Sequence, residues 1–179
     1  MRPSRRESVA ERRQRRAAVD DPQVVLDAAA RFLETRPRSV TEVRRRLVGA
    51  GYRPELVQGA IDRLLELGIL DDAAFARSWV ESRDRAWPRG ERAIREELRL
   101  KGIDRATIDA VLEERHESGG GEPDRDAATR LIERHARSLA RVADPRKRRE
   151  RAYALLARNG FDPEVCREVA AEVGGPETR

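Results

Sequence analysis

Few residues in this sequence carry the side chains that metal or covalent chemistry requires. The chain has one cysteine, Cys166, and two histidines, His116 and His135, which lie too far apart in sequence for the ligand spacing of a zinc site. The glycine run at 119–121 is not followed by the Lys-Ser/Thr pair of a phosphate-binding loop. No nucleophile stands beside a base in a recognisable motif. The sequence therefore predicts a protein that is not an enzyme and that uses no metal and no cofactor.

Arginine dominates the chemistry that remains, which is the recognition of anions. The 179 residues include 38 Lys and Arg against 33 Asp and Glu, which gives a net charge of +5. Only Lys101 and Lys147 among those basic residues are lysine, a bias that a GC-rich genome would produce as readily as function would. Function must therefore be inferred from where the charge lies rather than from its total.

Basic residues recur in three segments, at 44–46, 92–101 and 146–151. The first contains Arg44, Arg45 and Arg46, the second Arg92, Arg95, Arg99 and Lys101, and the third Arg146, Lys147, Arg148, Arg149 and Arg151. Such repeated stripes suit an elongated polyanionic partner, whose affinity would fall steeply with salt. For any single arginine the alternative is a solvated side chain that pairs with a neighbouring glutamate.

The segments at 54–66 and 163–172 have the opposite character, because most of their charged residues are acidic. A helix-turn-helix protein reads DNA with its later helix, which must approach phosphates and base edges. Acidic later helices argue against that class. A direct DNA-binding protein, such as a helical transcription regulator, is therefore the alternative interpretation rather than the first one.

Two tryptophans, Trp79 and Trp87, stand among arginines, and an aromatic ring in that setting can stack on a base or anchor a protein interface. The arginines around them are Arg83, Arg85 and Arg89. Trp79 follows Phe75 by four residues, so both rings lie on one helix face and Trp79 is expected in the core. Trp87 precedes Pro88 in a predicted loop and is the better candidate for the surface.

A signature of Leu, three residues, Gly and an apolar residue occurs three times and shows how these segments are organised. The copies are Leu47–Tyr52, Leu98–Ile103 and Leu156–Phe161. A glycine just after a helix adopts the left-handed conformation, and the next residue then packs back on the leucine five positions earlier. Each copy is therefore expected to mark the end of one helix and the start of the next.

The periodicity around each copy predicts a trio of helices. The predicted helices span 23–35, 40–50 and 54–67, then 72–85, 90–101 and 105–116, then 124–140, 145–159 and 163–173. Ser39 with Glu42 is expected to form a capping box, and Asp71, Asp104 and Asp162 are expected to cap later helices. The fold class is all-α, an elongated tandem array of three three-helix repeats with a basic N-terminal arm. An ordinary helical bundle with coincidental glycines is the alternative.

The predicted domain organisation follows from these helices. Residues 1–22 are expected to form a basic arm that is largely disordered or, as the alternative, extends the first helix. Residues 23–70 form the first predicted repeat, 71–117 the second, 118–123 a Gly-rich linker about which the last two repeats hinge, and 124–179 the third repeat and tail. The arm lacks the apolar stretch of a signal peptide, and no apolar run approaches the ~20 residues that span a bilayer. A cytoplasmic location, with no membrane partner, is therefore expected.

Three segments resemble the RecX family. Residues 67–76 resemble its Leu-Asp-Asp-x-x-Phe-Ala segment, and residues 90–103 resemble its Gly-x-x-x-Ile-x-x-Glu-Leu-x-x-Lys-Gly-Ile run. Residues 39–47 are similar to its Ser-x-x-Glu-Leu-Arg-x-Lys-Leu segment, with Val43 and Arg46 as the departures. The resemblance covers residues 25 to about 172 and is strongest from 39 to 112.

The resemblance implies a regulator that binds in the groove of the RecA–single-stranded DNA filament. Members of the family modulate the ATPase, strand-exchange and co-protease activities of RecA, usually by inhibition, in homologous recombination, DNA repair and the SOS response. The implied partners are the RecA filament protein and the single-stranded DNA within it, with weak direct DNA binding as a further interaction. The chain is expected to act as a monomer.

Twelve residues are predicted to contact RecA or DNA, on the grounds of charge, exposure and placement. They are Arg44, Arg45, Arg83, Arg85, Trp87, Arg89, Arg92, Arg95, Arg99, Lys101, Arg148 and Arg149. Besides the direct DNA-binding protein, a structural adaptor for an acidic protein remains an alternative. Sequence-specific binding to duplex DNA would favour the former, and binding that survives nuclease treatment would favour the latter.

Overall fold

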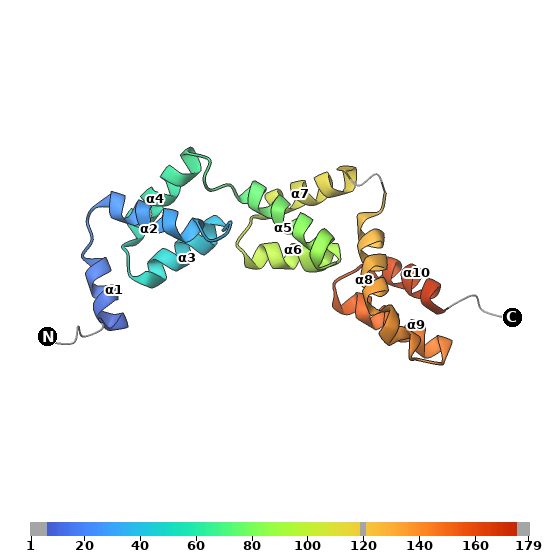
Figure 1. Ribbon diagram of the computed structural model, residues 1–179. Coiled ribbons are helices and arrows are strands. Elements are labelled where there is room, and N and C mark those ends of the chain that lie inside the picture. The colour runs from blue at the N-terminus through green and yellow to red at the C-terminus, as the bar shows by residue number, and fades with distance from the viewer. Residues whose placement is uncertain (1–6, 119–120, 175–179) are drawn as a thin grey trace. The chain divides into compact units, whose positions relative to one another are not determined.

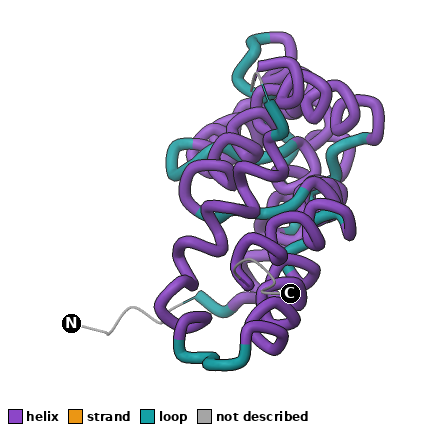
Figure 2. The backbone as a smooth tube through the Cα atoms, turned by 90° about the vertical axis from the view of Figure 1, so that its right-hand side faces the viewer, coloured by secondary structure: helices purple, strands orange, loops and turns teal. Residues whose placement is uncertain are grey.

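The computed structural model describes residues 7–118 and 121–174, and this part of the chain contains ten helices and no strand (Figures 1 and 2). The helices are α1 (Val9–Ala17), α2 (Pro22–Leu33), α3 (Val40–Ala50), α4 (Pro54–Glu66), α5 (Asp72–Ala86), α6 (Glu91–Leu100), α7 (Arg105–Ser118), α8 (Pro123–Ala140), α9 (Pro145–Arg158) and α10 (Pro163–Gly174). The all-α prediction is confirmed, and the nine predicted helices end within one or two residues of their expected positions. Within the described ranges, no helix has the length and apolar character needed to cross a membrane.

The predicted glycine turns are present where helices end. Gly51, Gly102 and Gly160 have φ angles of 107°, 81° and 81°, all in the left-handed region. The Tyr52 amide donates to the Leu47 carbonyl at 3.2 Å, and the Phe161 amide donates to the Leu156 carbonyl at 3.4 Å. These bonds satisfy carbonyls that a helix end would otherwise leave unpaired.

Among the described residues, 7–75 together with 101–103 form one compact unit, here called the first unit. In its described part, α2 packs on α3 and α4, while α1 contacts α3. Its core is built from Val25, Ala29, Val43, Leu47, Tyr52, Val57, Ala60, Ile61, Leu64 and Leu70. Helices α2, α3 and α4 thus make one trio around a shared apolar core.

Ser39 has a second role in the first unit beyond its predicted cap. The expected capping box is present, because the Ser39 hydroxyl accepts from the Glu42 amide at 3.2 Å. The same hydroxyl donates to the Lys101 carbonyl at 2.6 Å, and the side chain is fully buried. The hydroxyl therefore fixes the segment 101–103 against the start of α3.

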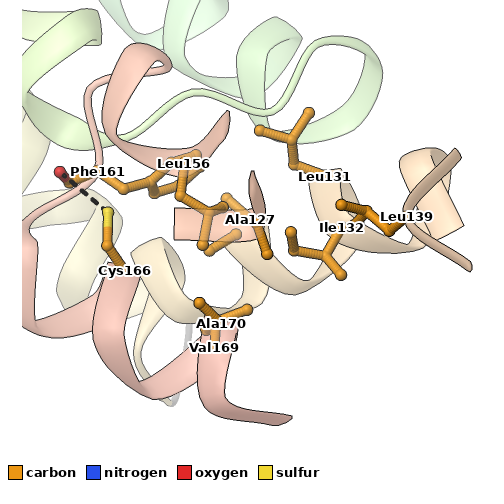
Figure 3. Close-up of a cluster of buried hydrophobic side chains, with 11 residues drawn as sticks. Ala127, Leu131, Ile132, Leu139, Leu156, Phe161, Cys166, Val169 and Ala170 are labelled. Carbon is orange, nitrogen blue, oxygen red and sulfur yellow. Dashed lines mark hydrogen bonds between the residues drawn. The ribbon is translucent and has the colours of Figure 1, made fainter. Parts of the chain in front are cut away.

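The described residues within 76–100 and 104–174 form the second unit, which includes most of α5 and helices α6 to α10. Helices α8, α9 and α10 pack on one another, and Figure 3 shows the apolar core between them. This core comprises Ala127, Ala128, Leu131, Ile132, Leu139, Ala152, Leu156, Phe161, Cys166, Val169 and Ala170. Cys166 is buried, donates to the Phe161 carbonyl at 3.6 Å, and has a pKa raised by that burial.

The second and third trios contact each other within the second unit through backbone and side-chain groups. The Gly90 amide donates to the Asn159 carbonyl at 3.0 Å, and the Arg115 guanidinium lies 2.8 Å from an Asp124 carboxylate oxygen. The Arg134 guanidinium donates to the Ala86 carbonyl at 2.5 Å. These contacts link the two trios on either side of the segment 118–123, about which the sequence predicts a hinge. Two residues of that segment, 119 and 120, lie outside the described residues.

The N-terminal arm differs from its expected disorder, since residues 9–17 form helix α1. The Ser8 hydroxyl accepts from the Glu11 amide at 3.2 Å, and the Glu11 carboxylate accepts from the Ser8 amide at 2.7 Å. This capping box satisfies two amides that a helix start leaves unpaired, and the Ala, Arg and Gln residues that follow favour helix. The Ser-x-x-Glu pattern was a readable signal for it. Residues 1–6 of the predicted arm lie outside the described residues.

Candidate partner-binding surfaces

The first unit presents Arg44 and Arg45 on the exposed side of α3. The Arg44 guanidinium donates to the Gln58 side chain of α4 at 2.5 Å, and Gln58 in turn donates to Asp62 at 2.6 Å. Arg45 lines a groove that α3 shares with α1. Both predicted site residues of this helix are therefore accessible to a partner.

Lys101 is directed into the first unit rather than toward solvent. Its ammonium lies 2.8 Å from a Glu42 carboxylate oxygen, and only 24% of the lysine side chain is exposed. Burial alone would raise the pKa of Glu42, but hydrogen bonds from Lys101 and from the Ser39 amide outweigh it and lower that pKa. Lys101 thus serves to hold the segment 101–103 on α3, which leaves it poorly placed to meet a partner.

Arg83 and Arg89 converge on one carboxylate in the second unit. Glu97 lies 2.6 Å from Arg83 and 3.7 Å from Arg89, and it accepts from the Trp79 indole at 2.8 Å. The Arg83 guanidinium also stacks 4.4 Å from the centre of the Trp79 ring. Arg89 donates to the Asn159 side chain at 2.6 Å. These two arginines are part of a half-buried network that joins α5, α6 and the end of α9.

Arg85 and Trp87 lie at the exposed end of α5 and in the loop that follows it. Trp87 is 68% exposed, as its place beside a proline led us to expect. The Arg85 side chain is 78% exposed and lies 3.7 Å from Glu81, a distance that gives a weak surface pair. An exposed indole beside a solvated guanidinium is a combination typical of the residues that dominate binding energy at interfaces.

We expect Trp87→Ala to change the free energy of unfolding by less than about 0.5 kcal/mol, because an exposed side chain contributes little to folding. Trp79→Phe should cost about 1 kcal/mol, because it removes the indole hydrogen bond to Glu97. Urea denaturation followed by circular dichroism would measure both values. A cost above about 1.5 kcal/mol for Trp87→Ala would show that the ring is packed in the fold rather than available to a partner.

Three predicted arginines lie along α6. Arg95 forms an ion pair with Asp109 of α7, and Arg99 lies 2.8 Å from Glu96 on its own helix. Arg92 is exposed and forms no ion pair with any residue in the described ranges. Arg92 and Arg99 can therefore contact a partner without breaking an ion pair between helices. Arg95, by contrast, takes part in the packing of α6 on α7.

The third trio holds Arg148 and Arg149, both half-buried on α9. Arg148 donates to the carbonyls of Val142 and Ala143, at 3.1 and 3.5 Å, and so supports the turn before α9. Arg149 lines a groove of about 580 Å³ between α9 and α10. The other residues around that groove are Arg146, Glu150, Tyr153, Arg167 and Ala170.

The structure thus separates the predicted site residues by their surroundings. Those that hold parts of the fold together are Arg83, Arg89, Arg95, Lys101 and Arg148. Those that are exposed are Arg44, Arg45, Arg85, Trp87, Arg92 and Arg99. Arg149 lies between the two groups, half-buried at the edge of its groove. Among the six exposed residues, Arg44 and Arg45 belong to the first unit and the other four to the second.

Sequence reasoning missed a set of arginines on α1. Arg12, Arg13 and Arg16 line a groove together with Arg45 and Arg46 of α3. The signal was present in the Arg-rich residues 8–17, but without the helix their side chains had no fixed direction.

No arrangement for metal binding is present in the described part of the chain, where no three His, Cys, Asp or Glu side chains come together in a suitable group. The His116 ring lies 2.9 Å from a Glu91 oxygen, and the His135 ring lies 2.9 Å from the Leu131 carbonyl of its own helix. Each histidine therefore has a local structural contact in place of a shared site.

Sequence profiles of three family domains match the chain in order. The RecX first three-helix domain matches residues 26–64, the RecX second three-helix domain residues 71–112, and the RecX third three-helix domain residues 122–170. These ranges correspond to α2–α4, α5–α7 and α8–α10. The predicted tandem of three-helix repeats is thereby confirmed, and α1 lies outside all three matches.

Individual proteins show the same relationship. Regulatory protein RecX of Mycobacterium avium (strain 104) is 33% identical over 150 residues, which cover 83% of this chain and 84% of that protein. Regulatory protein RecX of Chlorobium phaeobacteroides (strain BS1) is 29% identical, over 86% of this chain and 95% of that protein. The crystal structure of RecX from Lactobacillus salivarius aligns with a TM-score of 0.73 at 21% identity, over 86% of this chain and 97% of that one. At that identity the structural likeness speaks for the fold alone.

Proposed function

Because the chain belongs to the RecX family, we propose that it regulates the RecA recombinase by binding in the groove of the RecA–single-stranded DNA filament. The observation that carries the proposal is the ordered match of all three RecX domains to residues 26–170. Relatives that align with most of this chain are named regulatory protein RecX. The expected outcome is inhibition of the ATPase, strand-exchange and co-protease activities of RecA in the cytoplasm, during DNA repair and the SOS response.

A regulator of this kind works by occupancy and needs no catalytic group. A filament offers repeated acidic side chains and phosphates, and exposed arginines can meet either with charge-assisted hydrogen bonds. We assign this role to the six exposed site residues described above, with Trp87 as the aromatic anchor. Five of the other predicted residues support the fold around them, so their loss would act on stability first.

The proposal predicts that Arg92→Glu with Arg99→Glu raises the concentration of this protein needed for half-inhibition of RecA by about tenfold or more. Reversing two exposed charges of α6 replaces attraction to the filament with repulsion. Arg95 is left intact because Arg95→Glu would face Asp109 and disturb α7. The measurement is ATP hydrolysis by RecA on single-stranded DNA with substoichiometric amounts of this chain.

The matched control is Arg137→Glu with Arg141→Glu, which changes the net charge equally at two exposed positions at the end of α8. The concentration of this control needed for half-inhibition of RecA should lie within about twofold of that of the unmodified chain. An unmodified chain without effect on RecA would contradict the proposed function itself. Equal inhibition by the Arg92/Arg99 variant would contradict only the assignment of the surface.

The alternative of a sequence-specific reader of duplex DNA has less support. On α4, Glu55, Asp62 and Glu66 accompany a single basic residue, Arg63. On α10, the acidic residues Glu164, Glu168 and Glu172 accompany only Arg167. Later helices with this charge would repel the phosphates that flank a groove.

A further inference from the structure

A groove between α1 and α3 collects more positive charge than any surface considered above. Five arginine side chains line it, and its volume is about 640 Å³. They are Arg12, Arg13 and Arg16 from α1, and Arg45 and Arg46 from α3. Val9, Gly49 and Ala50 complete the lining, so that among the described residues no carboxylate faces the groove. All of these residues belong to the first unit.

Helix α1 is held against α3 by contacts that leave most of its arginines outward. Gly51 has φ 107°, and a Cβ at this position would lie 2.8 Å from the Arg13 carbonyl oxygen, so only glycine admits this approach. The Arg16 guanidinium donates to the Ala50 carbonyl at 3.4 Å and lies 5.6 Å from the centre of the Tyr52 ring. Arg16 therefore anchors α1, while Arg12 and Arg13 remain exposed beside it.

The acidic residues near α1 are engaged elsewhere. Glu7 lies 3.0 Å from Arg15, and Glu11 accepts from the Ser8 amide in the capping box. Neither of these two carboxylates is among the described residues that line the groove. Like charges that share a small groove repel one another, which raises the affinity of the site for an anion that bridges them.

The groove fits a chain of phosphates better than an acidic peptide. A guanidinium presents a planar fork of donors that matches two phosphate oxygens, and successive phosphates supply one anion after another. Peptide recognition depends on apolar anchors in pockets, and among the described residues of the lining the only sizeable apolar side chain is Val9. Phosphate contacts of this kind carry no base specificity.

We propose that this groove binds the phosphodiester backbone of nucleic acid, independently of base sequence and of RecA. Helix α1 precedes residue 26, where the first RecX domain match begins, so the three arginines of α1 lie outside those matches, whereas Arg45 and Arg46 lie within the first of them. The inference goes beyond the proposed regulation of RecA and does not depend on it. Its effect would be to tether the chain to DNA by its N-terminal helix.

The test uses the full chain and fluorescence anisotropy of a labelled oligothymidylate, without RecA. Arg12→Gln with Arg13→Gln should weaken binding about tenfold at moderate salt. The slope of log affinity against log salt should become shallower by about 0.7 for each phosphate of the single strand that the variant no longer neutralises, and so by about 1.4 for two. Circular dichroism would verify that both proteins retain the same helix content.

Arg137→Gln with Arg141→Gln is the matched control, because it removes the same charge from exposed positions on the third trio. It should weaken binding by no more than about twofold. Equal weakening by both variants would overturn the proposal, since binding would then follow net charge alone. Displacement by polyglutamate as effective as displacement by unlabelled oligothymidylate would overturn it as well. Because RecA is absent, neither result would bear on the RecA proposal.

Discussion

Arg115→Met is expected to lower the free energy of unfolding by about 3 kcal/mol, because it removes a buried cation from between two carboxylates. The Arg115 side chain is only 4% exposed. It lies 2.8 Å from Asp84 of α5 and 2.8 Å from Asp124 at the start of α8. Asp124 also accepts from the Glu91 amide at 3.0 Å. The substitution would leave two partly buried carboxylates facing each other across the contact between the second and third trios.

Denaturant unfolding followed by circular dichroism at neutral pH measures this cost. Arg105→Met is the matched control, since the Arg105 side chain is 93% exposed and its pair with Asp109 is 3.4 Å long. The control should change stability by less than about 0.5 kcal/mol. Adding Asp84→Asn to the Arg115→Met variant should recover part of the loss, because it removes one of the two stranded charges. A loss below about 1 kcal/mol for Arg115→Met would mean that the cluster is not a joint between the trios.

Gly90→Ala is expected to cost about 2–3 kcal/mol, through steric overlap rather than backbone strain. A Cβ on Gly90 would lie 2.3 Å from the Gly160 carbonyl oxygen and 2.3 Å from the Phe161 amide nitrogen. These are backbone atoms in the turn between α9 and α10, so they cannot turn aside as a side chain would. The Gly90 amide also donates to the Asn159 carbonyl at 3.0 Å, and separation of the two segments would lengthen that bond.

Gly59→Ala provides the control for Gly90→Ala. Gly59 lies within α4, and a Cβ there would meet nothing within 4 Å. Alanine should therefore be neutral or stabilise the protein by up to about 1 kcal/mol, because glycine has the poorer helix propensity. The midpoint temperature of thermal unfolding should fall for Gly90→Ala and should stay the same or rise for Gly59→Ala. A Gly90→Ala protein as stable as Gly59→Ala would show that the second and third trios do not pack as closely as described.

The sequence by itself determined the helices, their order and their turns. Ser39 with Glu42, Asp104 with Thr107, and the left-handed glycines act within a few residues of one another. Such interactions are encoded by spacing, so they can be read without knowing what packs on what. The same holds for the family, because its motifs are local runs of residues. Helix α1 was readable in this way too, from Ser8 and Glu11.

Only the tertiary structure decided which basic residues remain available to a partner. Arg89 and Arg92 are three positions apart and similar in sequence context, yet Arg89 bonds Asn159, seventy residues along the chain, while Arg92 stays exposed. Lys101 likewise meets Glu42, fifty-nine residues away. Charge pairing between distant segments depends on how the helices pack, and a helix period carries no information about a partner so remote in sequence. The arginine groove of α1 and α3 arises for the same reason. Its two sides meet only because Gly51, which has no side chain, allows α1 to pack close to the end of α3.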